Sequence, residues 1–313
     1  MKRRLKIFAG LTNQGLAREI CACLSINLGQ MTYKKFSNDN IKVRLEESVR
    51  EDDVFVLQSG YPDTNEALME LLIMIDTLKY ASASRITAVM PYYPYVRSDK
   101  KDEPRISITS RLVADLIRTA GANRILTMDL HAPQIGGFSH IPFDQLQIKH
   151  MMCDYIERKG LRNFVIAAPD VGSAKRAEGF ARRLDVPMVI LDKRRYSDNE
   201  KAEVLRIIGD VEGKDCFIVD DEVSTGGSMI EACRALRETG ANDLYGGCTH
   251  GILCGDASKR IDESVIKEFI TTNTIDQSKH KESEKIKVMS VAKLFSDAIA
   301  AIHMGTSVSK LFL

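Results

Sequence analysis

A short stretch of the chain places two carboxylates directly before a run of small residues. Residues 216–219 are apolar, Asp220 and Asp221 follow them, and a helix is expected to begin at Ser228. Backbone N–H groups of the intervening loop can converge on one phosphate at the helix N-terminus, where the dipole favours an anion. Paired carboxylates suit the neighbouring hydroxyls of a ribose. We therefore expect a sugar-phosphate site; the alternative is an ordinary strand-to-helix turn in which an Asp caps the helix. The loop residues are Ser224, Thr225, Gly226, Gly227 and Ser228.

Two other predicted strands end in residues that can handle phosphate or a metal ion. His131 follows the strand predicted over residues 125–128, and Asp170 follows the strand predicted over residues 164–167. Active sites of open α/β sheets gather at the carboxyl ends of the strands. Both residues are therefore expected to line a site.

Two polar segments have more than one interpretation. Residues 191–201 contain three consecutive cations, Lys193, Arg194 and Arg195. A solvated run of charge is the ordinary interpretation, but in a phosphate-handling protein such a segment is typical of a lid that brings cations to a polyphosphate. Residues 91–102 mix three tyrosines with charged residues, which suits either an irregular surface loop or the edge of a nucleotide site.

The composition excludes several classes of protein. The 313 residues include 44 Lys and Arg against 43 Asp and Glu, so the net charge of +1 provides no global field for nucleic acid or a membrane surface. No apolar run reaches the roughly 20 residues of a membrane span, and the N-terminal run is too short for a signal peptide. Seven cysteines without a CxxC indicate a reduced, cytoplasmic protein rather than a disulfide or zinc framework. Neither GxxxxGK(S/T) nor GxGxxG occurs, so a nucleotide must be held by another device.

Apolar runs rich in Ile, Val, Leu and Phe alternate along the chain with helical patterns. Helices are expected over residues 67–80 and 107–119, where apolar side chains recur at helical spacing. Strands flanked by such helices form βα units and a mostly parallel sheet that is covered on both faces. The fold class is therefore α/β. Strands are predicted over residues 5–9, 54–58, 86–90, 125–128, 164–167, 188–191, 216–219 and 244–248.

A strand–helix–strand unit over residues 53–91 recurs over residues 215–250. The first strand and the helix are displaced by the same number of positions between the two units. Duplication of one α/β domain explains this agreement; chance agreement within a general α/β alternation is the alternative. At about 150 residues per domain, the length favours two domains. We expect them over residues 1–147 and 148–313. The second domain then includes the extreme C-terminus, for which packing on the first domain is an alternative.

The stretch around Asp220 and Asp221 resembles the sugar-phosphate loop of the type I phosphoribosyltransferase fold. Together with the other motifs, essentially the whole chain resembles the ribose-phosphate pyrophosphokinase family. The resemblance implies two similar phosphoribosyltransferase-like domains, each a mostly parallel sheet flanked by helices. It also implies a homo-oligomer built from dimers, with three dimers forming a hexamer. The resemblance rests on residues 34–38, 47–50, 68–75, 95–102, 129–132, 169–170, 174–176 and 219–221.

The family's reaction transfers the β,γ-diphosphoryl group of ATP to the anomeric hydroxyl of ribose 5-phosphate and releases AMP. The resemblance implies Mg²⁺ as the cofactor, held through His131 and Asp170, and Lys193 and Arg195 as catalytic cations. ATP contacts are implied at Phe36, Asn38, Arg97, Asp102 and His131, the first two reaching the site of a neighbouring subunit. Ribose 5-phosphate contacts are implied at Asp170, Asp220, Asp221, Ser224, Thr225, Gly226, Gly227 and Ser228.

A regulatory site for phosphate or ADP is implied at Ser48, Arg50, Ser307 and Ser309. Several positions depart from the family's usual pattern, among them residues 136–139, which are Gly-Gly-Phe-Ser where Gln-Gly-Phe-Phe is usual. Asn40 stands where an acidic residue is frequent, Ser98 where Gln is frequent, Ser224 where Asp is usual, and Pro133 where a small hydroxyl residue is usual.

Two other functions remain open at this point. The departures at Asn40, Ser98 and Ser224 suit a non-catalytic regulatory subunit that assembles with an active paralogue. The sugar-phosphate loop alone suits a base-transferring phosphoribosyltransferase, although the two-domain length and the charged residues 97–102 argue against it.

Overall fold

The computed structural model describes residues 3–195, 203–280 and 282–312, without the side chains of residues 193–195, 203–205 and 312. Contacts between residues divide the chain into two compact units. The first unit comprises Met1–Gln147, Asn273–Asp276 and Ser290–Leu313, and the second comprises Ile148–Thr272 and Gln277–Met289. The chain therefore returns twice from the second unit to complete the first.

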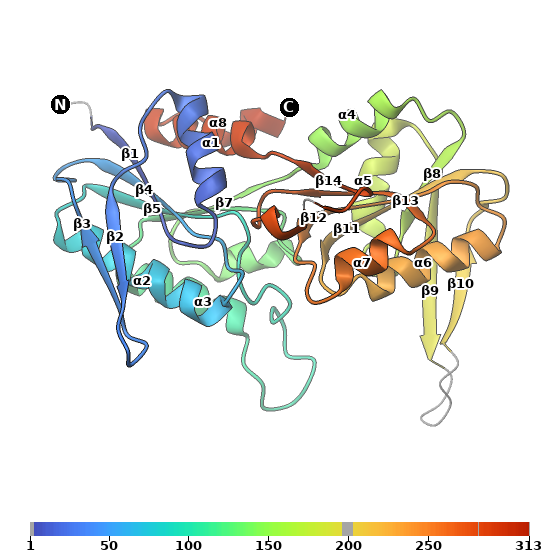
Figure 1. Ribbon diagram of the computed structural model, residues 1–313, viewed down its shortest axis with the longest axis horizontal. Coiled ribbons are helices and arrows are strands. Elements are labelled where there is room, and N and C mark those ends of the chain that lie inside the picture. Colours follow the sequence, from blue (N-terminus) through green and yellow to red (C-terminus); the bar gives the residue numbers. More distant parts are fainter. Residues whose placement is uncertain (1–2, 196–202, 281, 313) are drawn as a thin grey trace. The chain divides into compact units, whose positions relative to one another are not determined.

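The first unit is built on a parallel sheet with the strand order β1-β4-β5-β6-β7. Every residue of β4 is buried, as expected for an apolar strand that is covered on both faces. Helices α1 and α8 pack together on one face and α2 and α3 on the other (Figure 1). The strands are β1 (Leu5–Ala9), β4 (Asp53–Leu57), β5 (Arg85–Met90), β6 (Arg124–Met128) and β7 (Phe143–Leu146). The helices are α1 (Gln14–Leu24), α2 (Thr64–Tyr80), α3 (Thr109–Ala120) and α8 (Ala292–Met304).

An antiparallel hairpin is added to the first unit outside its main sheet. It is formed by β2 (Met31–Lys35) and β3 (Ile41–Leu45), and β3 packs against α2. Of the ten residues in its strands, only Val43 is fully buried. The hairpin is therefore an arm of the first unit rather than part of its core.

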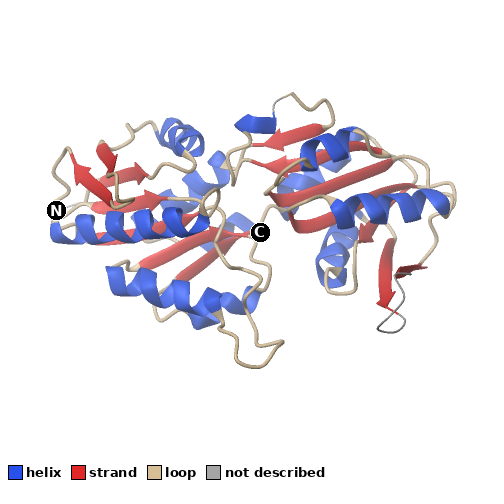
Figure 2. Cartoon of the chain, turned by 60° about the horizontal axis from the view of Figure 1, so that its bottom comes forward, coloured by secondary structure: helices blue, strands red, loops and turns tan. Residues whose placement is uncertain are grey.

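The second unit is built on a sheet with the strand order β10-β9-β8-β11-β12-β13-β14, parallel except for the β9–β10 pair. Helices again cover it on both sides, as the blue ribbons around the red strands show (Figure 2). The strands are β8 (Phe164–Ala168), β9 (Met188–Arg195), β10 (Glu203–Ile208), β11 (Asp215–Val223), β12 (Leu244–Gly251), β13 (Ile266–Thr272) and β14 (Ile286–Met289). The helices are α4 (Lys149–Lys159), α5 (Ala174–Leu184), α6 (Gly227–Glu238) and α7 (Ala257–Asp262).

The predicted α/β class and the predicted strands are confirmed. Each of the eight predicted strands overlaps a strand of the structure, the helices predicted over residues 67–80 and 107–119 correspond to α2 and α3, and the helix expected to begin at Ser228 is α6. Six further strands were not predicted from the sequence: β2, β3, β7, β10, β13 and β14.

The largest difference from expectation concerns the cationic segment after residue 191. The strand predicted there continues through Arg195, and β9 pairs with β10 so that Lys193 lies opposite Leu205. The start of the expected polar loop is therefore a β-ribbon at one edge of the second sheet (Figure 1).

All seven cysteines lie within the described residues and are free, and five of them are buried. No helix in the described ranges has the length and apolar character needed to cross a membrane.

Candidate active site

The paired carboxylates lie on β11, the central strand of the second sheet (Figure 1). The strand ends at Val223, so Asp220 and Asp221 lie within it, whereas we expected them just after its end. The expectation was wrong because the pairing with β12 continues through Val223. Asp221 is 5% exposed and Asp220 is half-buried, so both carboxyl groups are largely withdrawn from water.

Burial and mutual repulsion oppose the ionisation of this pair. Burial, and next the neighbouring charge of Asp221, raise the pKa of Asp220 above its ordinary value. One Asp220 carboxyl oxygen accepts a hydrogen bond from the backbone N–H of Asp221 at 2.9 Å. The guanidinium of Arg176 lies 3.9 Å from an Asp221 oxygen. Such a pair can retain a proton, so it can both donate to and accept from neighbouring hydroxyl groups.

The loop after β11 has the geometry expected of an anion site. Gly226 has φ +74°, a left-handed conformation that favours glycine, and α6 begins at the next residue. No side chain within the described ranges caps the N-terminus of α6. The N–H groups of its first turn are thus directed at whatever occupies the space before the helix.

A second segment fixes the position of this loop. The carbonyl of Val223 accepts hydrogen bonds from the N–H groups of Ile252 and Leu253 at 3.0 and 3.2 Å, and that of Ser224 accepts one from Cys254 at 2.9 Å. The hydroxyl of Ser224 also lies 3.5 Å from the sulfur of Cys254. The chain that connects β12 to α7 is therefore joined to the loop through backbone bonds.

Asp170 lies at the same end of the second sheet as the carboxylate pair, where the parallel strands β8 and β11 have their carboxyl ends. It follows β8, which is paired in parallel with β11, and its charge contributes to the raised pKa of Asp220. One Asp170 oxygen accepts hydrogen bonds from Ser173, from the N–H at 2.7 Å and the hydroxyl at 2.9 Å. The side chain is exposed, so it is oriented by Ser173 and remains open to a ligand.

The two expected catalytic cations belong to the ribbon described above. The backbones of Lys193 and Arg195 lie in β9, opposite Leu205 and Glu203 of β10. Their side chains, and residues 196–202, lie outside the described part of the structure.

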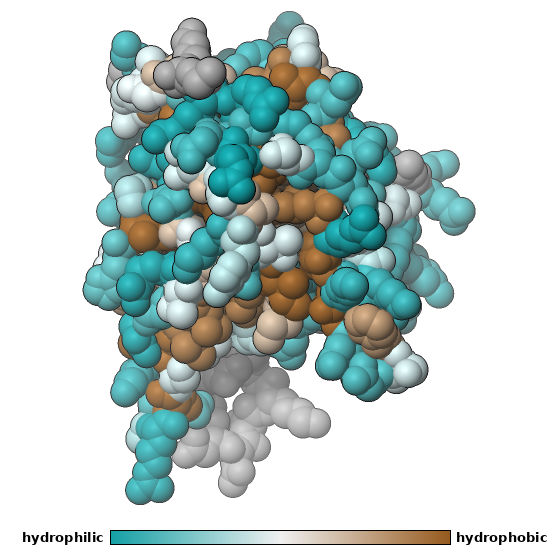
Figure 3. All heavy atoms as spheres, turned by 90° about the vertical axis from the view of Figure 1, so that its left-hand side faces the viewer, coloured by the Kyte–Doolittle hydropathy of each residue, from teal (hydrophilic) through white to brown (hydrophobic). Residues whose placement is uncertain are grey.

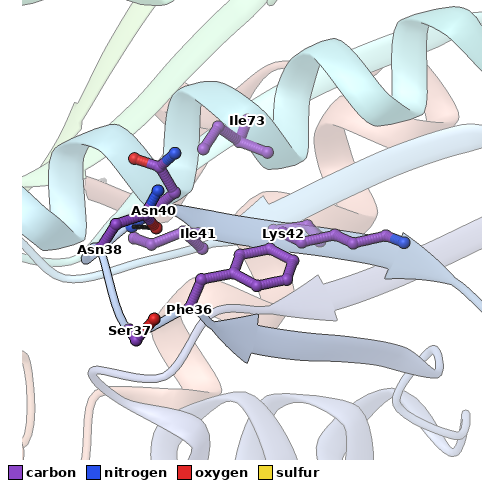
Figure 4. A pocket seen from close by; sticks show the side chains of 8 residues that line it. Phe36, Ser37, Asn38, Asn40, Ile41, Lys42 and Ile73 are labelled. Carbon is purple, nitrogen blue, oxygen red and sulfur yellow. Dashed lines mark hydrogen bonds between the residues drawn. The ribbon is translucent and has the colours of Figure 1, made fainter.

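A pocket on the β2–β3 hairpin contains two residues that were expected to bind ATP (Figure 4). Phe36 and Asn38 line it at the turn, and Ile73 contributes from α2. The volume is about 700 Å³. The ring of Phe36 is 41% exposed, and the ammonium of Lys34 lies 5.1 Å from its centre. An aromatic face with a cation beside it can receive a planar, electron-rich group.

The other expected ATP contacts follow two adjacent strands of the first sheet. Arg97 and Asp102 lie after β5 and His131 lies after β6, and all three are exposed. The amide of Gln134 donates a hydrogen bond at 2.9 Å to Asp99, which connects the two loops. The structure thus brings these residues to one edge of the first unit.

Two departures from the family pattern have a local structural role. The hydroxyl of Ser98 donates to the carbonyl of Ser107 and accepts from the N–H of Thr109, both at 3.1 Å. Ser98 therefore closes the loop that contains Asp102. Pro133 begins a 3-10 helix, η1 (Pro133–Phe138), a position where the missing N–H of proline costs nothing.

The four residues of the expected regulatory site all lie in the first unit. Ser48 and Arg50 follow β3, and Ser307 and Ser309 follow α8. All four are exposed.

One residue beside the loop was not expected from the sequence. Arg260 of α7 donates a hydrogen bond at 3.1 Å to the carbonyl of Thr225. Its distance along the chain from the loop, 35 residues, left no local pattern that could have revealed the contact. Among the residues described, no group of three or more His, Cys, Asp or Glu side chains gathers to hold a metal ion.

Comparisons with known proteins agree over the whole length. The family model for the N-terminal domain of ribose phosphate pyrophosphokinase matches residues 5–121, and that for the phosphoribosyl synthetase-associated domain matches residues 195–313. The chain is 49% identical over 314 residues to the ribose-phosphate pyrophosphokinase of Clostridium tetani, covering 99% of this chain and 98% of that protein. It is 50% identical over 309 residues to that of Caldanaerobacter subterraneus, covering 98% of each. The crystal structure of phosphoribosylpyrophosphate synthetase from Mycobacterium smegmatis superposes with a TM-score of 0.92 at 40% identity, covering 97% of this chain and 100% of that one.

Proposed function

Because the chain belongs to the ribose-phosphate pyrophosphokinase family, we propose that it transfers the diphosphoryl group of ATP to the anomeric hydroxyl of ribose 5-phosphate. The products are phosphoribosyl pyrophosphate and AMP. The observation that carries this proposal is the β11–α6 segment, where a largely buried carboxylate pair precedes an uncapped helix N-terminus within the described ranges.

Ribose 5-phosphate fits this segment in one orientation. The first-turn N–H groups of α6 and the loop hydroxyls receive the phosphate, because that is where donors and the positive end of the helix dipole coincide. Asp220 and Asp221 receive the ribose hydroxyls, and Asp170 lies close enough to raise the pKa of Asp220. The loop residues assigned to the phosphate are Ser224, Thr225, Gly226, Gly227 and Ser228.

The transfer step requires positioning and charge neutralisation more than covalent chemistry. The anomeric oxygen forms a bond to the β-phosphorus of ATP and loses its proton, while the bond from that phosphorus to the α,β-bridging oxygen breaks and AMP leaves with it. We assign charge neutralisation to Lys193 and Arg195. Cations that arrive with the ribbon favour the transition state over the bound ground state.

The donor set of Asp170 fits Mg²⁺, which prefers oxygen ligands and keeps several waters. Its carboxylate is exposed and oriented by Ser173, so one protein oxygen plus substrate oxygens can complete the coordination. A bound Mg²⁺ would neutralise phosphate charge. His131 offers nitrogen, which Mg²⁺ rarely takes, so we assign it to an ATP oxygen or a metal-bound water.

ATP is assigned to the first unit. The exposed ring of Phe36 offers a stacking surface for adenine and Asn38 a hydrogen-bonding amide, while Arg97 and Asp102 lie on the loop after β5. We propose that the hairpin serves the site of a neighbouring subunit, so that the active enzyme is a homo-oligomer built from dimers, a hexamer of three dimers. Figure 3 shows apolar residues exposed among polar ones on one face of the molecule. Exposed apolar side chains of the first unit, Leu11, Met69 and Met304 among them, support such an interface.

A steady-state assay tests the proposal. The purified oligomer should form AMP from ATP and ribose 5-phosphate in the presence of Mg²⁺. AMP formation should be abolished in a Lys193→Ala variant of unchanged melting temperature. Failure of the wild-type oligomer to form AMP would overturn the proposal.

Two additional measurements separate the proposed function from the two other functions. A regulatory subunit would form no AMP alone but would change the activity of an active relative on mixing. A base-transferring phosphoribosyltransferase would consume phosphoribosyl pyrophosphate and a base without ATP. We place the activity in the cytoplasm, which the seven free cysteines support.

A further inference from the structure

We infer that Arg260 supplies the positive charge of the sugar-phosphate loop and binds the 5-phosphate of the substrate. This inference rests on the assignment of ribose 5-phosphate to the β11–α6 segment. It adds to that site a cationic residue from a separate element, α7.

The loop has no cation of its own. Residues 216–230 contain three carboxylates, Asp220, Asp221 and Glu222, and no lysine or arginine. A phosphomonoester carries about 1.5 to 2 negative charges near neutral pH, whereas a helix N-terminus offers about half a positive charge. A cation from another element would therefore lower the electrostatic cost of binding a phosphate at this loop.

Arg260 lies where such a group is needed. Its Nη1 atom donates to the carbonyl of Thr225 at 3.1 Å, and its Nη2 atom lies 3.4 Å from the position that a Cβ on Gly227 would occupy. Because Cα–Cβ bonds in a helix tilt toward its N-terminus, Nη2 lies beside the N-terminal opening of α6. The side chain is exposed, so a ligand can reach it.

The helix that bears Arg260 is held rigidly against the loop. Ala257 and Ile261 of α7 are buried, and the carbonyl of Ala257 and the side chain of Ile261 lie within 4 Å of a Cβ built on Gly226. On its other side, Ser258 is 2.5 Å from the ring of His280, and Ser283 donates to Asp262 at 2.6 Å. The cation is therefore placed before the substrate arrives, which lowers the ordering cost of binding.

The geometry of arginine suits both the hydrogen bond to the carbonyl of Thr225 and the proposed binding of the phosphate. A guanidinium has five N–H donors in a rigid fork, so one donor can hold the Thr225 carbonyl while others bind phosphate oxygens. A lysine at this position would keep the charge but lose the fork. The conservative variant therefore separates charge from geometry.

The test compares kinetic constants of Arg260→Gln and Arg260→Lys with those of wild type. Lys259→Gln is the matched control, because it removes a cation from the same helix whose ion pair, at 3.9 Å, is with Glu263 at the C-terminal end of α7 and not with the loop. Loss of a charged hydrogen bond corresponds to about 10- to 100-fold in affinity. We expect Arg260→Gln to raise KM for ribose 5-phosphate by about that factor, with KM for ATP and the melting temperature unchanged. Arg260→Lys should recover part of the loss, and Lys259→Gln should match wild type.

The outcomes are distinguishable from failure of the proposed function. If wild type forms no AMP, the proposed function fails. If wild type is active but Arg260→Gln leaves KM for ribose 5-phosphate unchanged, or changes it no more than Lys259→Gln does, only the role of Arg260 is overturned. An equal rise in both KM values with a lower melting temperature would overturn it too, because that pattern indicates a structural role.

Discussion

At Asp220 the fold opposes the ionised form of a side chain that faces a proposed substrate. The side chain is half-buried, and it interacts with the neighbouring carboxyl of Asp221. Neither property stabilises the folded chain. Such pairs are retained at functional sites because the ligand, rather than the protein, satisfies them.

The raised pKa predicts how Asp220→Asn changes the pH dependence of stability. Burial and Asp221 raise the pKa of Asp220 to about 8, whereas the unfolded value is about 3.9. The native state therefore binds more protons than the unfolded state between these values, and the contribution of Asp220 to stability is lost as pH rises toward 8. Asp220→Asn should raise the melting temperature at pH 8.5, change it little at pH 4, and raise KM for ribose 5-phosphate. Scanning calorimetry at both pH values checks this. An equal stabilisation at both would show that ionisation is not the cause.

Gly226 offers a second test at the scale of one residue. Its φ of +74° costs a residue with a Cβ about 1–2 kcal/mol, although an added Cβ would make only ordinary contacts at 3.7 Å or more. Gly226→Ala should therefore lower stability by about that amount, and weaken ribose 5-phosphate binding by disturbing the loop. Gly227→Ala is the control, because Gly227 does not have a positive φ. Denaturant unfolding of the two variants measures the difference, and equal losses would contradict the argument.

The residues of this site differ in how far the sequence reveals them. Asp220, Asp221 and the loop are adjacent in the chain, so their residue types indicate a sugar-phosphate site directly. Arg260 reaches the loop only because β12 and α7 bring it back, and its neighbours on α7 form no pattern that indicates binding. Site residues that are adjacent in the chain can be recognised from the sequence, whereas a residue that the fold brings to the site from a distant segment cannot.

At the scale of elements, a buried ion pair attaches the end of α8 to the first sheet. Arg85 donates to both oxygens of Asp53, at 2.7 and 2.5 Å, and to the carbonyl of Ile302 at 2.9 Å. His303 lies 2.7 Å from the same carboxylate. Asp53 is 1% exposed, so its charge depends on these partners.

Asp53→Asn should destabilise the first unit strongly. Removing one partner of a buried pair costs about 3–5 kcal/mol, because the other charge remains without compensation. The matched control is Asp243→Asn, which breaks a 2.5 Å pair with Lys267 in which both side chains are well exposed. That control should cost less than about 1 kcal/mol. Urea unfolding of both variants gives the comparison, and similar losses would show that Asp53 contributes no more than a surface charge.

The sequence predicted elements according to how completely they are buried. Strands such as β4, an apolar run buried along its whole length, were found, because continuous apolar residues between turns have few other interpretations. The hairpin strands were missed, although Ile41, Val43 and Leu45 alternate with charged residues in β3. The end of β9 was missed beyond residue 191, since residues 192–195 are all charged and only backbone pairing makes them a strand. Strand β10 was missed although four of its six residues are apolar.

At the scale of the whole molecule, the order of segments along the chain differs from their grouping in space. The amide of Asn13 donates to the carbonyls of Asn273 and Thr274, at 2.9 and 3.1 Å, across 260 residues or more. Residues 273–276 and 290–313 therefore belong to the first unit, although they follow most strands of the second unit along the chain. Length and repeats indicated two domains, but they contain no information about which one receives the C-terminal helix.

This arrangement predicts that the first unit cannot fold without the end of the chain. Helix α8 buries Phe295 and Ile299 completely and packs against α1, whose Leu16 and Ile20 are equally buried. A chain ending at Met289 should therefore expose these faces, bind the dye ANS, lose its near-UV circular dichroism and elute as an aggregate. A chain ending at Gly305 is the control. It retains α8 and should keep the melting temperature of the full chain, while losing any response to phosphate that depends on Ser307 and Ser309. A cooperative, monodisperse chain ending at Met289 would show that the returning segment is dispensable for the first unit.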